Sequence, residues 1–491
     1  MLHGDHGGHF EGGYVTAPRD AHGGAKKISL YPLASADDLC YTMCIFYWGC
    51  KIRGRERPKR GADNRARTRG KARFFMEWAK KEDGWRVPVK SWCANLEQSA
   101  LEQAANLAKH PAIFHHVALM PDAHAGYGMP IGGVAAFENS VVPYAVGNDA
   151  GCGMHSVQTN LPAELMSEMS VRRDFQNRLK KRVPVGEAVH SQEQSWDGFD
   201  EYLDNGGNAL LASPRIRKAL GTVGGGNHFV ELQKSDKVYE QYAYAEEGKV
   251  WFMVHTGSRS LGGALANLYH TTAVGLCHRW HSAIPCDELA FLPVSSEEGQ
   301  AYLRDMTFAL KYALENRRRI ASVMKETLFD MFGGSFDGLS FLAENDVHHN
   351  YASLEHHFGK DVWVHRKGAT LARAGGTGII PGSMGTASYI VEGCGNEESF
   401  CSSSHGAGRR MSRTAANSTF TVEECDKAME GIVCERWQKV RGWKKGESVE
   451  TSQFDLSESP MAYKDIENVM NSQKDLVGKC VRLVPLACLK G

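Results

Sequence analysis

One glycine-framed turn constrains the fold of this chain more than any other stretch. Residues 141–146 are almost entirely apolar and predict a buried strand. Three glycines follow at once and frame Asp149 and Cys152, which lie three positions apart. Because glycine lets a backbone turn tightly and approach other groups closely, both side chains could bind one divalent metal ion. Taken alone, the turn fits equally well a buried cysteine beside a capping aspartate.

The composition is that of an ordinary globular protein, with 491 residues of which 42% are hydrophobic. No apolar run is long enough to cross a bilayer, and the first forty residues do not resemble a signal peptide. The thirteen cysteines show no dense repeated spacing, which predicts reduced thiols rather than a disulfide framework. We therefore expect a cytoplasmic protein without a membrane segment.

The first 84 residues differ from the rest of the chain. Residues 51–73 hold eleven Lys and Arg against two acidic residues, a net charge of about plus nine. Such a run can bind nucleic acid electrostatically, but it is more often solvated and disordered. The sequence predicts a low-complexity, basic, disordered extension over 1–84 and one catalytic domain over 85–491.

From residue 85 onward, short apolar stretches end in glycine-rich, polar loops. The spacing predicts a helix over 95–109, strands over 113–120 and 250–254, and mostly helical segments over 163–220 and 264–330. This pattern favours an α/β fold with mixed sheets whose strand-end loops converge on one site.

Three arginines follow a stretch of apolar residues at helical spacing. They are Arg317, Arg318 and Arg319. The pattern is that of an amphipathic helix, and the arginines are interpreted as its solvated face.

Histidines recur in the same glycine-rich or strand-end setting as the opening turn. One such histidine would more often be structural than a metal ligand. Three of them, together with Asp149 and Cys152, offer imidazole, thiolate and carboxylate, a mixture that suits Zn, Mn, Fe or Co better than Mg. Five ligands exceed one tetrahedral structural site, so a catalytic or two-metal site is the better prediction.

Phosphate handling is indicated by glycine loops close to Arg259, Lys367 and Arg409, although such loops can also be plain tight turns. Neither the Walker A motif nor the dinucleotide fingerprint is present. His405 stands among small residues, so a bulky group could approach its ring. The spacing alone leaves its role open between metal ligand, acid–base group and nucleophile.

These motifs, in this order, resemble the RtcB family of RNA ligases over residues 85–491. The motifs are MPDAHAGYG at 120–128, the Asp149/Cys152 turn, GNH at 226–228, HTGSR at 255–259, HHN at 348–350, HRKGA at 365–369, HGAGR at 405–409, PMAYKD at 460–465 and KG at 490–491. The resemblance implies an α/β fold of the RtcB type, with strand-end loops around a dinuclear metal site. It also implies a GTP- and Mn²⁺-dependent ligase that joins an RNA 3′-phosphate or 2′,3′-cyclic phosphate to a 5′-hydroxyl through a histidine–GMP intermediate, in RNA repair or tRNA splicing.

The resemblance also implies roles for individual residues. Two Mn²⁺ ions would be held, with Cys152 bridging them, by Asp149, Cys152, His228, His255 and His349. His405 would be the guanylylated nucleophile, and the residues supporting its chemistry would be Asp122, Glu231 and Arg409. Phosphate contacts would come from Asn227 and Arg259, and guanosine contacts from Ser383, Tyr463 and Lys490.

The chain departs from the family pattern around the metal turn, at Asn148, Ala150 and His155. His155 stands where many members carry arginine, which bears on RNA contacts or the response to pH. Of the adjacent His348 and His349, the second is preferred as the ligand.

Two other functions compete with ligation. One is a metal-dependent phosphoesterase that acts on RNA ends without guanylylation, and the other is a non-catalytic RNA-binding paralogue. For a ligase we expect a monomer whose substrates are RNAs with 3′-phosphate or 2′,3′-cyclic phosphate and 5′-hydroxyl ends, with an archease-type activator as a further partner.

Overall fold

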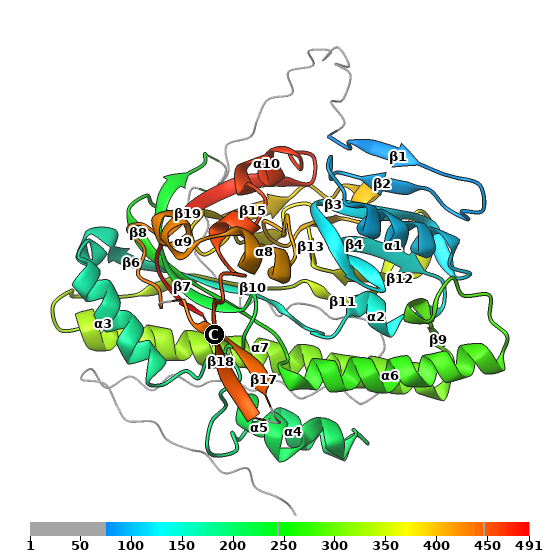
Figure 1. The fold of residues 1–491 in the computed structure, drawn as a ribbon, viewed down its shortest axis with the longest axis horizontal. Coiled ribbons are helices and arrows are strands. Elements are labelled where there is room, and N and C mark those ends of the chain that lie inside the picture. The colour runs from blue at the N-terminus through cyan, green and yellow to red at the C-terminus, as the bar shows by residue number, and fades with distance from the viewer. Residues whose placement is uncertain (1–74, 241, 243–244, 436, 445–446, 491) are drawn as a thin grey trace, which may run out of the picture. The chain divides into compact units, whose positions relative to one another are not determined.

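The computed structural model describes residues 75–490 apart from 241, 243–244, 436 and 445–446, and the statements below concern these residues. Residues 1–74 of the predicted extension lie outside them. Two large sheets dominate the fold (Figure 1), with six strands in the order β1-β2-β3-β4-β12-β11 and seven in the order β10-β6-β8-β7-β19-β15-β14. The first is mixed, because β2 and β3 are parallel, and the second is antiparallel throughout. Three two-stranded pairs complete the set, β13-β16, β17-β18 and β5-β9.

The strands of the first sheet are β1 (Trp78–Lys80), β2 (Val89–Ser91), β3 (Ile113–Tyr127), β4 (Met129–Phe137), β12 (Lys360–Lys367) and β11 (Asn350–His357). Those of the second are β10 (Phe341–His348), β6 (Gly153–Pro162), β8 (Lys249–Thr256), β7 (Phe229–Val238), β19 (Val477–Lys490), β15 (Ser388–Gly393) and β14 (Thr377–Ile380). The short pairs use β5 (Ser140–Val141), β9 (Leu292–Pro293), β13 (Ala369–Leu371), β16 (Ser402–Ser404), β17 (Lys439–Lys444) and β18 (Glu447–Phe454).

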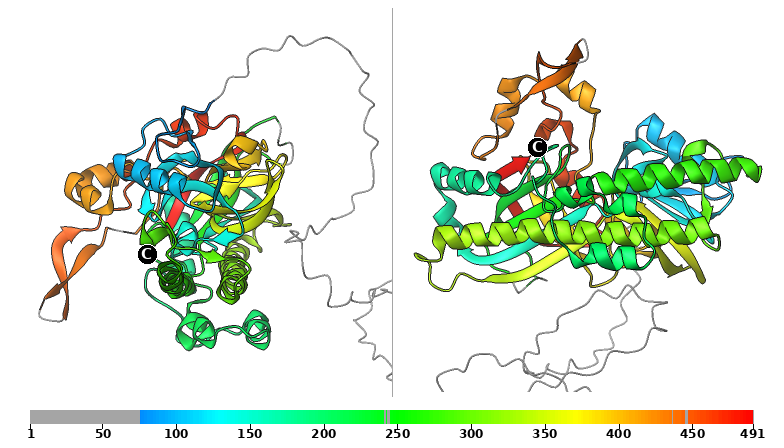
Figure 2. Two further views of the ribbon diagram at one scale, coloured as in Figure 1. Left: turned by 90° about the vertical axis from the view of Figure 1, so that its right-hand side faces the viewer. Right: turned by 90° about the horizontal axis from the view of Figure 1, so that it is seen from below.

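The helices surround the two sheets. They are α1 (Gln98–Lys109), α2 (Pro143–Val146), α3 (Met169–Lys180), α4 (Asp197–Asp204), α5 (Pro214–Ala219), α6 (Ser260–Arg279), α7 (Glu297–Phe332), α8 (Arg413–Thr419), α9 (Val422–Ala428) and α10 (Ile466–Asn471). Figure 2 shows the two longest, α6 and α7, side by side. Among the described helices, none is both long and apolar enough to cross a membrane.

The predicted α/β fold is confirmed, and of the two large sheets the six-stranded one is mixed. The predicted helix over 95–109 is α1, and the strands predicted over 113–120 and 250–254 lie within β3 and β8. The segments expected to be helical contain α3 to α7. Strand β1, which falls within the predicted extension, pairs with β2.

The predicted strand over 141–146 is wrong. The chain leaves β5 at Val141 and forms the helical turn α2, with Pro143 in its first turn. Proline has no N–H to offer a strand ladder, and its fixed φ suits the start of a helix. The apolar character that suggested a strand instead buries this helical turn.

The interpretation of the three arginines is also wrong for one of them. On α7, Arg318 is exposed, but the Arg317 side chain is 0% exposed. Buried apolar side chains on α7 pack with the strands of the seven-stranded sheet, including Ile320 and Met324 of the helix and Phe252 of β8. Because α7 is covered on more than one side, its buried face extends to Arg317.

The register of four neighbouring strands decides where the site forms. In the antiparallel order β10-β6-β8-β7, Gly153 lies opposite both His348 and Thr256, and His255 lies opposite Phe229. The ends of all four strands therefore meet at one edge of the sheet. His349 follows β10 directly and precedes β11, so it lies where the chain passes from the seven-stranded sheet to the six-stranded one.

Candidate metal and nucleotide site

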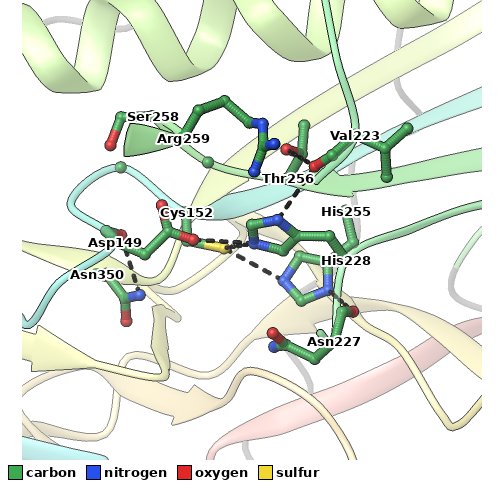
Figure 3. Close-up of polar contacts among 12 residues, drawn as sticks. Asp149, Cys152, Val223, Asn227, His228, His255, Thr256, Ser258, Arg259 and Asn350 are labelled. Carbon is green, nitrogen blue, oxygen red and sulfur yellow. Dashed lines mark hydrogen bonds and ion pairs between the residues drawn. The ribbon is translucent and has the colours of Figure 1, made fainter. Parts of the chain in front are cut away.

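Five side chains of the predicted metal site converge at this sheet edge. Figure 3 shows four of them, Asp149, Cys152, His228 and His255. The Sγ atom of Cys152 lies 3.3 Å from Nε2 of His228 and 3.4 Å from Nε2 of His255. On one side of this group, an Asp149 carboxylate oxygen lies 2.9 Å from Nε2 of His228. On the other, Nε2 of His349 lies 3.3 Å from Nε2 of His255. Residues from four separate chain segments thus place donor atoms within contact distance.

Backbone carbonyls orient two of the imidazoles. Nδ1 of His228 lies 3.1 Å from the carbonyl of Val223, and Nδ1 of His255 lies 3.0 Å from that of Asn227. A carbonyl only accepts hydrogen bonds, so Nδ1 carries the proton in each ring and Nε2 keeps its lone pair. This arrangement is typical of histidines that bind a metal through Nε2.

Burial favours the neutral form of two imidazoles of the group, those of His255 and His349. It lowers the pKa of His255 and of His349 well below the ordinary value, so both rings are neutral at pH 7. Burial and the nearby charge of Asp149 raise the pKa of the Cys152 thiol well above its ordinary value. Neutral imidazole is the form that coordinates metal, and a bound cation would draw the proton from the thiol.

The donor set fits a borderline divalent metal. Cys152, His228 and His255 offer donor atoms that all lie within 4.8 Å of one another. Two buried polar atoms beside them, Oδ1 of Asp149 and Nδ1 of His349, have no hydrogen-bond partner among the described residues. Nitrogen, sulfur and oxygen donors together suit Mn, Fe, Co or Zn. Cys152 contacts both His228 and His255. That it bridges two metal ions stays a prediction.

Two residues without a predicted role, Asn350 and Gly257, hold the turn that carries Asp149 and Cys152. Nδ2 of Asn350 donates to the carbonyl of Asp149 at 3.1 Å, and its Oδ1 accepts from the amide of Gly368 at 2.7 Å. A side chain at Gly257 would collide with the Asp149 carboxylate, so the close approach of this turn to β8 requires glycine.

His405 is held by a buried carboxylate. Oδ2 of Asp122 accepts hydrogen bonds from Nδ1 of His405 at 2.7 Å, from its backbone amide at 3.2 Å and from the amide of Gly406 at 3.3 Å. Burial would raise the pKa of Asp122, but the neighbouring His405 and Lys464 keep it below its ordinary value. With Nδ1 engaged, Nε2 is the nitrogen of His405 that is left to react.

His405 lies beside His349, one of the predicted metal ligands. Its ring packs edge-on against that of His349, with 4.8 Å between the centroids. On the opposite side, Nζ of Lys464 donates to the carbonyls of Ala123 at 2.7 Å and Pro121 at 3.2 Å, which flank Asp122. The predicted nucleophile and the predicted metal site therefore form one continuous centre.

A cavity of about 200 Å³ opens beside His405. Its walls include every residue predicted to hold guanosine, namely Ser383, Tyr463 and Lys490. Four others with predicted roles also line it: Asn227, His255, His405 and Arg409. The pairing of β19 with β7 sets Lys490 opposite Phe229, next to His228. The C-terminal strand thus supplies a cation to a cavity that is also lined by His255, one of the predicted metal ligands.

Glu458 links the charged residues of this cavity and had no predicted role. It accepts hydrogen bonds from the Tyr463 hydroxyl and from Arg409 at 3.3 Å, and it pairs with Lys490 at 3.1 Å. These cations lower the pKa of Glu458 to about 2, although burial opposes the shift. No sequence motif marks this residue beyond its position just ahead of the PMAYKD stretch.

Arg259 and Glu231, which also have predicted roles, do not line the cavity. Arg259 contacts Thr222 and the carbonyl of Gly186, each at 3.0 Å, and stands beside the metal group (Figure 3). Glu231 is buried behind the cavity, where its carboxylate accepts from Gln233. Burial raises the pKa of Glu231 to about 8. The phosphate contact predicted for Arg259 and the support of the His405 chemistry predicted for Glu231 both stay predictions.

Comparison with known proteins gives one consistent result. A sequence model of the family described as tRNA-splicing ligase RtcB matches residues 103–214 and 208–491. The chain is 36% identical over 425 residues to the RNA-splicing ligase RtcB of Escherichia coli (strain K12), which covers 82% of this chain and 98% of that protein. It is 34% identical over 458 residues to the tRNA-splicing ligase RtcB of Methanococcus maripaludis, with 81% and 92% covered. It is likewise 34% identical over 454 residues to that of Thermococcus kodakarensis, with 80% and 92% covered.

Proposed function

The chain belongs to the RtcB family, and we propose that it is an RNA ligase that uses GTP and Mn²⁺ to join a 3′-phosphate or 2′,3′-cyclic phosphate end to a 5′-hydroxyl end. The observation that carries this proposal is the placement of His405. Its Nδ1 is bound to a buried carboxylate, its ring packs against the ligand His349, and it forms part of a cavity wall. A nucleophile, a metal group and room for a nucleotide are thus adjacent.

His405 is the proposed site of guanylylation. Its Nε2 attacks the α-phosphorus of GTP, and pyrophosphate leaves. Asp122 holds the proton on Nδ1 and stabilises the positive charge that develops on the ring. The same carboxylate also binds the backbone amides of 405 and 406, so the ring and the chain that carries it are fixed together.

The RNA is joined in two further transfers. The RNA 3′-phosphate takes GMP from His405, which converts a poor leaving group into an activated end. The 5′-hydroxyl of the second RNA then attacks the activated phosphorus and displaces GMP. Mn²⁺ held by Asp149, Cys152, His228, His255 and His349 would supply activation of water for opening a cyclic phosphate and neutralisation of the phosphoryl oxygens.

The cavity supplies the nucleotide contacts in this proposal. Lys490 and Arg409 bring positive charge, and Ser383 and Tyr463 bring hydroxyl groups. Glu458 holds Tyr463, Arg409 and Lys490 at fixed positions, so the cavity is arranged before a nucleotide enters. Asn227, Arg259 and Glu231 are proposed to act on phosphate groups and on the chemistry from its margins.

Labelled GTP tests the proposal directly. The protein is incubated with Mn²⁺ and GTP labelled at the α-phosphate, with and without RNA that carries a cyclic phosphate and a 5′-hydroxyl. We expect an acid-labile protein label without RNA and a joined strand with it. His405→Ala should form no label, whereas His356→Ala, at an exposed histidine of β11, should behave as the wild type.

The other outcomes identify the competing functions. If RNA is cleaved or dephosphorylated and GTP makes no difference, the protein is a phosphoesterase acting on RNA ends. If RNA is bound but Mn²⁺ is not, it is an RNA-binding paralogue.

We further propose a cytoplasmic monomer that acts in RNA repair or tRNA splicing, with an archease-type activator as partner. The described cysteines form no disulfide among themselves, which fits a reducing compartment. Light scattering would give the oligomeric state, and turnover measured with and without archease would test the activator.

A further inference from the structure

Arg317 of α7 is buried and held by hydrogen bonds inside the protein. Nε and Nη2 donate to the two carboxylate oxygens of Asp346, at 2.7 and 2.6 Å. Nη1 donates to the carbonyls of Gly151 at 2.9 Å and Thr256 at 3.0 Å. Nη2 also lies 3.2 Å from Nδ1 of His348. A guanidinium has five N–H donors, and four of them donate to the carboxylate and the two carbonyls. Nδ1 of His348 donates to the carbonyl of Gly151 at 3.1 Å, so its contact with Arg317 is one of packing.

Three of the residues that surround Arg317 lie next to proposed metal ligands in the sequence. Gly151 directly precedes Cys152, Thr256 directly follows His255, and His348 directly precedes His349. These ligands come from segments about 100 residues apart in the sequence. One side chain therefore connects the backbone of two ligand segments and the side chain next to the third ligand.

We propose that Arg317 is a positioning residue that fixes the relative placement of Cys152, His255 and His349 and so prepares the metal site before metal binds. The inference rests on the proposed function, because it takes these residues as ligands. Within the described structure, Arg317 binds the backbone beside these ligands and not their coordinating atoms. It does not line the nucleotide cavity.

A chain of ionic contacts holds Arg317 in turn. Asp346 neutralises the buried guanidinium, and on its other side it contacts Nδ1 of His155 at 3.2 Å. Nε2 of the same ring lies 3.3 Å from Glu344. His155, one of the positions that departs from the family pattern, therefore serves this network rather than the cavity.

Lysine cannot replace arginine in this role. A lysine keeps the charge opposite Asp346, but it offers a single nitrogen and cannot reach both carbonyls and the carboxylate together. Arg317→Lys therefore keeps the positive charge but removes the planar set of N–H donors. The matched control is Arg318→Lys, because Arg318 is the next residue on the same helix and is exposed.

The test measures metal binding, not turnover. The wild type, Arg317→Lys and Arg318→Lys are freed of metal and titrated with Mn²⁺, with free Mn²⁺ followed by electron paramagnetic resonance. We expect the Kd of Arg317→Lys to rise about 10- to 100-fold, as for other residues that orient metal ligands. Arg318→Lys should match the wild type. Co²⁺ binding adds a spectroscopic check, since the thiolate-to-cobalt absorption band should weaken only when Cys152 is misplaced.

A second variant covers the case in which Arg317→Lys does not fold. Asp346→Asn keeps the arginine and its carbonyl contacts but weakens its anchor, so its Mn²⁺ affinity should fall by a smaller factor. Circular dichroism of the metal-free proteins establishes folding. A folded Arg317→Lys with wild-type Mn²⁺ affinity and an unchanged Co²⁺ band overturns the inference, as does loss of folding in both variants, which would assign a general structural role. Failure of the wild type itself to bind Mn²⁺ would instead overturn the proposed function, and the inference with it.

Discussion

A single oxygen atom of Asp122 accepts two hydrogen bonds from His405 and a third from the next residue. Oδ2 accepts from the imidazole Nδ1, from the backbone amide of His405 and from that of Gly406. The residues are 283 positions apart, and Asp122 is 0% exposed. A buried carboxylate with these partners both selects the ring tautomer and fixes the direction of Nε2, which is what a histidine nucleophile requires.

Replacing this carboxylate should slow guanylylation far more than it lowers stability. In Asp122→Asn the side chain keeps its size but loses the charge that stabilises the imidazolium. We expect the single-turnover rate of GMP transfer to His405 to fall by about 10²- to 10⁴-fold. Asp361→Asn, at an exposed aspartate of β12, is the control. A labelling rate within a few-fold of the wild type would show that Asp122 does not assist the nucleophile.

Replacing the thiol that lies among the metal ligands should weaken metal binding. Cys152 contacts both His228 and His255, and serine offers a harder and far less acidic donor. Equilibrium titration of Cys152→Ser should show at least about a tenfold loss of Mn²⁺ affinity. Cys394→Ser, at an exposed cysteine, should leave the affinity unchanged. Equal affinity in the two variants would remove Cys152 from the ligand set.

Loss of the cation near the C-terminus should act on GTP binding. Lys490 forms part of the cavity wall and pairs with Glu458. A hydrogen bond to a charged group contributes about 1.5–3 kcal/mol, so Lys490→Met should raise the KM for GTP by about 10- to 100-fold and change kcat less. Steady-state RNA ligation measured against GTP concentration gives both constants. Lys474→Met serves as the exposed control, and an unchanged KM would exclude a nucleotide contact by Lys490.

Glu231 should make the protein less stable as the pH rises. Burial raises its pKa from 4.5 to about 8, so between these values the folded state retains a proton that the unfolded state releases. The free energy of unfolding therefore falls across this range, by at most about 1.4 kcal/mol per pH unit. Glu231→Gln cannot ionise and should gain in Tm relative to the wild type from pH 5 to pH 8.

The control for this comparison is Glu423→Gln, at an exposed position. Its difference in Tm from the wild type should stay constant over the same range. A constant difference for Glu231→Gln as well would show that this carboxyl titrates normally in the folded protein.

Some elements were predictable from local pattern and others were not. The amphipathic spacing over 95–109 identified α1, because helix periodicity is a local property. The apolar run at 141–146 was misassigned, because a buried helical turn and a buried strand look alike over six residues and Pro143 decided between them. Arg317 was taken for a solvated residue, since nothing local distinguishes it from Arg318.

The amino-acid sequence by itself determined the chemistry of the centre: which residues can donate to a metal, which histidine stands among small neighbours, and where glycine permits close approach. Only the tertiary structure decided which of these groups meet. Antiparallel register places the ends of β7, β8, β6 and β10 at one edge, and helix packing turns Arg317 inward and brings Glu458 to Tyr463. Residue type is a local property, whereas proximity between distant segments depends on the pairing and packing of the whole chain.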